Sequence, residues 1–127
     1  MYDALPSRER SFDADYVGQI TGHRYKGTFT VYCVLDISQM HAAELEKSRL
    51  TLDIRNPTNG LKGVSNVLGE LRTRIIEGPA WWKDSKLGTS ILDFDLLSYL
   101  LDKCDELEDL WKDEIKKKAG EIASKND

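Results

Sequence analysis

The stretch LKGVSNVLGELRTRIIEGPAWW, residues 61–82, predicts a helix, a stop and a loop that carries two adjacent tryptophans. Glycine favours the position just after a helix and proline cannot continue one, so Gly78 and Pro79 mark the end of this helix. Apolar side chains recur before that stop with the 3.6-residue period of an amphipathic helix, at Leu61, Val64, Leu68, Leu71 and Ile75. We therefore expect a helix over residues 61–77.

The loop of residues 77–85, EGPAWWKDS, places Trp81 beside Trp82. One interpretation is a lid, in which one indole covers the end of the core and the other lies flat on the surface. The alternative is a binding anchor, because tryptophan buries a large area at interfaces with few rotatable bonds. In both interpretations Pro79 stiffens the start of the loop.

Before this helix, residues 16–36 alternate in the manner of β-strands. The segments YVGQITG (16–22) and TFTVYCVLD (28–36) predict two strands, with Gly22 and Gly27 bracketing a turn. A hairpin alone is marginally stable, so it is expected to pack on a helix or on another strand. A helix is expected to follow it, with Ser38 as its N-cap.

A long final helix is expected from near Asp93 or Asp95 to about Ala123, and this acid pair is interpreted as a helix cap. About 30 residues is long for one helix in so small a domain, so its last turns should project or lie against another chain. Its apolar side chains form a near-heptad stripe at Leu97, Leu100, Cys104, Leu107, Trp111, Ile115 and Ile122.

These elements predict an α+β fold, in which an N-terminal β-hairpin or small antiparallel sheet packs on three helices, the last one long. Residues 16–127 are expected to form a single domain with a projecting C-terminal helix. Residues 1–15 are expected to be a flexible N-terminal arm, with only a few apolar side chains among its charges. That arm is either a disordered tail or a segment that orders on a partner.

The composition of the 127-residue chain excludes some functions. A net charge of −4 argues against binding to nucleic acid, which favours a basic protein surface. The sequence has no apolar run of about 18 residues that would span a membrane, and no secretory signal at its start. Cys33 and Cys104 lie within apolar patterns and are interpreted as buried thiols in a reducing compartment; the alternative is a disulfide between them.

The sequence also lacks motifs for catalysis or metal binding. His23 and His41 belong to no metal-ligand spacing with cysteine or carboxylate residues, and no nucleophile, phosphate-loop or zinc-protease motif occurs. Arg72 and Arg74 are expected to pair with carboxylates. We therefore predict no catalytic residues, no metal and no cofactor.

Four patterns follow one another over residues 16–112. They are a strand with glycine and Phe-x-Val, a helix ending in Arg-Ile, a Pro-x-Trp-Trp segment and an Asp-led helix. The residues that match are Gly27, Phe29, Val31, Leu71, Arg74, Ile75, Pro79, Trp81, Trp82 and Asp95. In this order the pattern resembles small morphogenesis proteins of tailed bacteriophages, of the tail-assembly, chaperone-like type. The segment before residue 16 departs from that family pattern.

The resemblance implies a non-enzymatic protein that binds other phage structural proteins in the host cytoplasm during assembly. An alternative is a virion accessory protein, such as a capsid decoration, neck or tail component, retained in the particle. An enzyme with an unrecognised site and a small nucleic-acid-binding module are further alternatives. We also expect self-association through the end of the last helix. The candidate protein-binding residues are Trp81, Trp82, Pro79, Tyr2, Leu5, Phe12, Trp111 and Ile115.

Overall fold

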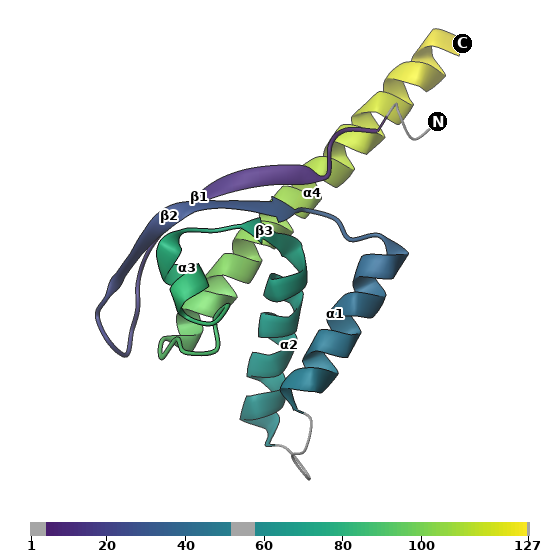
Figure 1. The fold of residues 1–127 in the computed structure, drawn as a ribbon. Helices are drawn as coiled ribbons and strands as arrows, with labels where there is room; N and C mark the ends of the chain where they lie inside the picture. The colour runs from purple at the N-terminus through teal and green to yellow at the C-terminus, as the bar shows by residue number, and fades with distance from the viewer. Residues whose placement is uncertain (1–4, 52–57, 127) are drawn as a thin grey trace.

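The computed structural model of the protein describes residues 5–51 and 58–126, with side chains up to residue 120 (Figure 1). This part of the chain forms three strands and four helices, which confirms the predicted α+β fold with a small antiparallel sheet and a long last helix. In chain order the elements are β1 (Glu9–Val17), β2 (Arg24–Tyr32), α1 (Ile37–Leu50), α2 (Asn59–Arg74), β3 (Ile75–Glu77), α3 (Ala80–Asp84) and α4 (Phe94–Asn126). The short helix α3 carries the two tryptophans, where a loop was predicted.

The sheet has the strand order β1-β2-β3, and both pairings are antiparallel. The register of the hairpin runs from Glu9 opposite Tyr32 to Val17 opposite Arg24. The predicted strands at 16–22 and 28–36 were therefore wrong in position, because the turn lies earlier in the chain. The hairpin turn is closed by the Gly18 amide, which donates a hydrogen bond to the His23 carbonyl over 2.9 Å.

The predicted flexible arm at residues 1–15 is also corrected, because residues 9–15 belong to β1. This strand has an alternating pattern, in which Phe12, Ala14 and Tyr16 pack on the core while the residues between them face solvent. The Phe12 ring stacks on Phe29 with 5.4 Å between centroids. Backbone pairing along nine residues and burial of this apolar face offset the entropy that ordering costs. Residues 1–4 lie outside the described residues.

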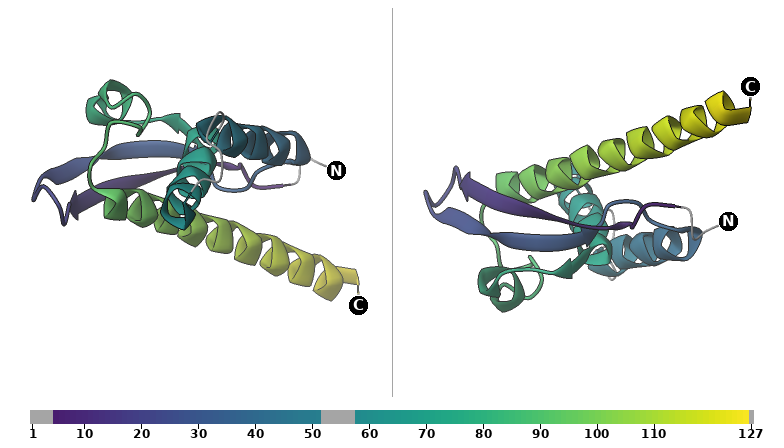
Figure 2. Two further views of the ribbon diagram at one scale, coloured as in Figure 1. Left: turned by 90° about the horizontal axis from the view of Figure 1, so that it is seen from below. Right: turned by 90° about the horizontal axis from the view of Figure 1, so that it is seen from above.

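Helices cover one face of the sheet and leave the other face to polar side chains. Figure 2 shows that α4 runs along the β1 edge of the sheet, while α1 lies toward the opposite edge. The main core residues come from β1, β2, α2, α3, the segment before α4 and the first half of α4; they are Ala14, Tyr25, Phe29, Val31, Leu68, Leu71, Trp82, Ile91, Leu96, Leu97, Leu100 and Cys104. The C-terminal half of α4 extends beyond the sheet (Figure 1).

Two helix boundaries differ from the sequence prediction. The N-cap of α1 is Asp36 rather than Ser38; its carboxylate accepts from the Gln39 amide, and the Gln39 side chain accepts from the Asp36 amide. The helix predicted over residues 61–77 begins earlier, behind the Thr58 cap, and ends at Arg74. It stops there because the next three residues pair with β2 as strand β3.

Arg74 connects three elements from a buried position at the end of α2. Its guanidinium donates to the Cys33 carbonyl over 2.8 Å and pairs with Glu70 and Glu108 at 3.4 and 3.3 Å. Arg72 pairs with Glu46 on α1. Both arginines thus have the carboxylate partners that the sequence predicted, and the pairs connect α2 to α1 and α4.

The two cysteines, Cys33 and Cys104, are free and fully buried, as predicted. Burial raises the pKa of the Cys104 thiol to about 12, so the thiol stays protonated near neutral pH. None of the helices that the structure describes is both long and apolar enough to cross a membrane.

Candidate protein-binding groove

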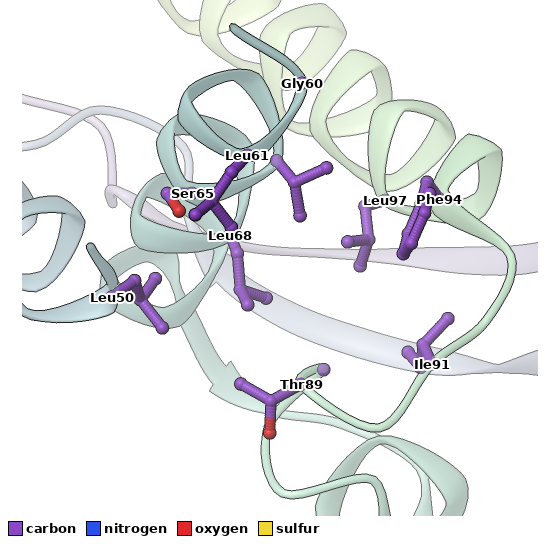
Figure 3. A pocket seen from close by; sticks show the side chains of 11 residues that line it. Leu50, Gly60, Leu61, Ser65, Leu68, Thr89, Ile91, Phe94 and Leu97 are labelled. Carbon is purple, nitrogen blue, oxygen red and sulfur yellow. The ribbon is translucent and has the colours of Figure 1, made fainter. Parts of the chain in front are cut away.

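An apolar groove of about 470 Å³ lies between α2, the first turn of α4 and the segment that precedes α4 (Figure 3). The last residue of α1 closes one end. The lining side chains come from four parts of the chain and are Leu50, Gly60, Leu61, Val64, Ser65, Leu68, Gly88, Thr89, Ile91, Phe94 and Leu97. We call this site the apolar groove.

The floor of the apolar groove belongs to the core, whereas its walls are partly exposed. Leu68, Ile91 and Leu97 are buried, while Leu61 and Val64 are half-buried. The only polar side chains among the described lining residues are the hydroxyls of Ser65 and Thr89, and none of these lining residues is charged or titratable. Such a lining recognises shape and apolar surface.

An exposed aromatic ring lies at the rim of the apolar groove. Phe94 lines the groove and is 54% exposed, whereas the exposed side chains of Leu87 and Leu92 line two other hollows. An exposed apolar ring beside an apolar hollow is typical of sites that contact another protein.

The sequence of α2 explains why this site exists. The stripe Leu61, Val64, Leu68, Leu71 runs the length of the helix, but the core covers only its second half. The first half lies across the groove from the segment before α4, in which Gly88 packs against Leu68 with a φ of 96° that favours glycine. The periodicity predicted the apolar stripe of this helix, but it carried no information on which half of the stripe stays uncovered.

The two tryptophans lie outside the apolar groove lining and pack on the sheet. Trp82 is fully buried, with its ring edge-on to Phe29 at 6.1 Å. Trp81 is half-buried; its indole N–H donates to the Lys26 carbonyl over 3.0 Å, and its ring lies edge-on to Tyr25 at 5.1 Å. Both indoles thus have partners within the chain, which favours the lid interpretation. Pro79 lies directly against Gly27 in β2.

The other candidate residues do not join the tryptophans in one surface. Phe12 stacks on Phe29, whereas Trp111 and Ile115 belong to the C-terminal half of α4 and Leu5 precedes Pro6, which contacts Trp111. There the Trp111 indole donates to the Pro6 carbonyl over 3.1 Å. Leu5 is exposed, Ile115 is half-buried, and Tyr2 lies outside the described residues.

Asp93 holds the turn between β1 and β2. Its fully buried carboxylate accepts from the amides of Ile20 and Thr21 at 2.8 and 3.0 Å, from the Thr21 hydroxyl at 2.6 Å and from the Tyr25 hydroxyl at 2.7 Å. Gly18 leaves room for the carboxylate, since a Cβ at that position would overlap it. The sequence analysis interpreted this acid as a helix cap and did not predict these hydrogen bonds to the hairpin.

Asp95 supports the same turn from the first turn of α4. Its carboxylate accepts from the Tyr16 hydroxyl over 2.7 Å and from the Gln19 amide over 3.0 Å. The acid pair of the sequence therefore connects the start of α4 to the hairpin. This contact fixes the segment that forms one wall of the apolar groove.

The Asp93 carboxylate has a pKa lowered from 3.8 to about 2, chiefly by the bond from the Thr21 hydroxyl and then by that from Tyr25. Because the folded-state pKa is the lower one, the ionised carboxylate stabilises the fold above pH 4, and this contribution is lost as the pH falls toward 2. We expect the stability difference between the wild type and Asp93→Asn, measured by urea unfolding, to be constant above pH 5 and to shrink between pH 4 and 2. A stability difference for Asp93→Asn that is unchanged at pH 2 would contradict the assignment.

Other potentially reactive side chains of the described chain do not assemble into a site. His23 and His41 are exposed, on the hairpin turn and on α1. Among the side chains of residues 5–51 and 58–120, no group of three or more histidine, cysteine or acidic residues could hold a metal ion. The apolar groove is therefore the strongest candidate site in the described structure.

Comparison with protein-family models, with curated proteins and with solved structures finds no match to the chain. The role of the apolar groove is therefore argued from its own geometry.

Proposed function

We propose that the protein is a non-enzymatic assembly or structural protein of a tailed bacteriophage, which binds another phage structural protein through the apolar groove. The observation that carries the binding role is the uncharged lining of the groove, together with the exposed Phe94 ring at its rim. The expected occupant is a segment of the partner that presents aliphatic or aromatic side chains. A small apolar molecule would occupy the floor of the groove but leave the Phe94 ring uncovered.

The phage assignment is supported by the residues that resemble tail-assembly proteins. In the structure half of these ten residues are buried in the interior formed by β2, α2 and α3: Phe29, Val31, Leu71, Arg74 and Trp82. These residues stabilise the fold, so the resemblance primarily supports a shared architecture. The phage function is inferred from that architecture by analogy.

Genetic complementation of the phage that encodes the chain tests this proposal. Deleting the gene should give particles without complete tails in electron micrographs, and a plasmid copy of the wild type should restore them. Leu61→Asp places a carboxylate in the groove and should weaken partner binding by about 30-fold or more, so it should fail to restore them. The substitution suits its position, since an acid in the first turn of a helix is favourable.

The matched control is Asn66→Asp, which adds the same charge on the exposed side of α2 and should complement fully. Complementation by Leu61→Asp would show that the groove is not the binding surface. Normal tails in the deletion would overturn the assembly role. Mass spectrometry of purified virions then separates the two forms of the proposal, because a chaperone is absent from the particle and a retained component is present at fixed copy number.

A further inference from the structure

Three consecutive residues in the segment between α3 and α4 have left-handed backbone conformations. Lys86 and Leu87 have φ angles of 56° and 53°, and Gly88 has a φ angle of 96°. Glycine adopts this conformation at little cost, whereas a residue with a Cβ is strained there. Such strain persists only where surrounding contacts enforce it, and it is concentrated at functional sites. We call residues 86–88 the left-handed turn.

The left-handed turn places its glycine in the wall of the apolar groove. A Cβ at Gly88 would lie 2.5 Å from Leu68 Cδ1 and 2.9 Å from Trp82 Cζ3, so the backbone packs directly on both side chains. Thr89 and Ile91 follow on the same segment and also line the groove (Figure 3). The conformation of the left-handed turn therefore determines the position of this wall.

Arg72 on α2 holds the carbonyl groups of the left-handed turn. Its Nε donates to the Leu87 carbonyl over 3.0 Å, and its Nη2 donates to the Lys86 carbonyl over 2.7 Å. Its Nη1 donates to the Glu46 carboxylate on α1, so each of the three nitrogens has an acceptor. The guanidinium suits this arrangement because its donors are fixed in one plane as a fork, which the ammonium group of lysine does not provide.

Two hydroxyl groups near the left-handed turn add local bonds. The Ser85 hydroxyl accepts from the Gly88 amide over 3.0 Å, and the Thr89 hydroxyl donates to the Lys86 carbonyl over 3.0 Å. Both bonds lie within the segment itself and move with it. The bonds from Arg72 come from α2, which lies across the groove, so they connect the left-handed turn to the rest of the site.

We propose that Arg72 is a positioning residue for the apolar groove, which opposes the strain at Lys86 and Leu87 and keeps Gly88 against Leu68. Without the guanidinium, Leu87 is expected to leave the left-handed region, and the wall moves with it. The groove then loses the shape that an apolar side chain of a partner requires. The inference rests on the proposed function for the binding of a partner, whereas the position of the wall is a property of the isolated protein.

Nuclear Overhauser contacts in the purified full chain test the position of the wall. The wild type should show contacts between the Gly88 α-protons and the Leu68 methyl groups, and Arg72→Gln should lose them. Adding Leu87→Gly to Arg72→Gln should restore these contacts, because glycine occupies the left-handed region without strain. A role of Arg72 in stability alone predicts no such rescue, since glycine at position 87 adds no contact.

Two further variants complete the comparison. Arg72→Lys keeps a charge beside Glu46 but cannot form the fork, so it should also lose the Gly88 contacts, and it replaces Arg72→Gln if that variant does not fold. Arg49→Gln is the matched control, because Arg49 donates to the same Glu46 carboxylate from within α1. It should keep the Gly88 contacts.

Persistence of the Gly88 contacts in both Arg72 variants would overturn the proposal, and so would their absence from the double variant with Leu87→Gly. In the complementation assay, Arg72→Gln should fail to restore complete tails and the double variant should restore them. Complementation by Arg72→Gln despite lost Gly88 contacts would instead count against the groove as the binding surface, and the positioning of the wall by Arg72 would stand.

Discussion

Trp82→Ala is expected to lower the free energy of unfolding by about 3–5 kcal/mol, the usual effect of removing a buried indole. Trp82 is 2% exposed and lies between Phe29 and Gly88, so its removal leaves a cavity that backbone shifts cannot readily close. Chemical denaturation followed by circular dichroism measures this loss. The apolar groove should open as well, because the segment at Gly88 forms its wall.

The neighbouring Trp81→Ala is the matched control. Its ring is half-buried, and its principal polar contact is the bond to the Lys26 carbonyl, so the expected loss is about 1–2 kcal/mol. Equal effects of the two substitutions would contradict the assignment of Trp82 as the buried member of the pair. A larger effect of Trp81→Ala would reverse it.

Asp93→Ala is expected to lower the melting temperature by about 10 °C, the second largest effect. The substitution removes the acceptor for the amides of Ile20 and Thr21 and for the hydroxyl of Tyr25, which then lie unpaired at a buried site. Thermal unfolding at pH 7 measures the shift. The hairpin turn should also gain amide exchange, because its backbone donors lose their partner.

Asp95→Ala serves as the comparison, since it removes one hydroxyl and one amide bond at a more exposed position. Asp95→Ala should lower the melting temperature by less than half as much as Asp93→Ala. If Asp93→Ala left the melting temperature unchanged, the carboxylate would not be what holds the hairpin turn to α4.

Much of the helical architecture was predictable because helix periodicity and stop signals are local properties of the chain. Leu68 and Leu71 in α2 and Leu100 and Cys104 in α4 are buried as their spacing indicated. The end of α2 was placed three residues too late, because the residues after Arg74 were assigned to the helix stripe. Their pairing with β2 depends on a strand that is more than 40 positions earlier in sequence, which no local pattern reveals.

The first strand was missed for a different reason. The segment that begins at Glu9 carries many charges, which suggested an arm, yet Phe12, Ala14 and Tyr16 alternate with polar residues throughout. That period of two is typical of a strand with one face in solvent, and it outweighs the charge content. Once β1 is placed there, Gly18 falls in the turn.

The candidate site could be predicted only in part. The stripe residues Leu61 and Val64 were identified, but the groove also needs Ile91 and Phe94, which join them only through the tertiary fold. The sequence analysis placed candidate protein-binding residues in the loop of the two tryptophans, because the exposure of these side chains could not be judged from sequence. The bond from Trp81 to the Lys26 carbonyl is a tertiary contact of the same kind.

The length of α4 sets a distance between the two ends of the molecule. Phe94 and Leu97 in its first turn line the apolar groove, and the helix has 33 residues in total, from Phe94 to Asn126. At 1.5 Å per residue this is roughly 48 Å along one axis. A partner seated in the groove is therefore kept apart, by a fixed span, from anything attached to the C-terminal end. In an assembly of repeating subunits such a span acts as a rigid spacer, and inserting or deleting one heptad of α4 would change it by about 10 Å.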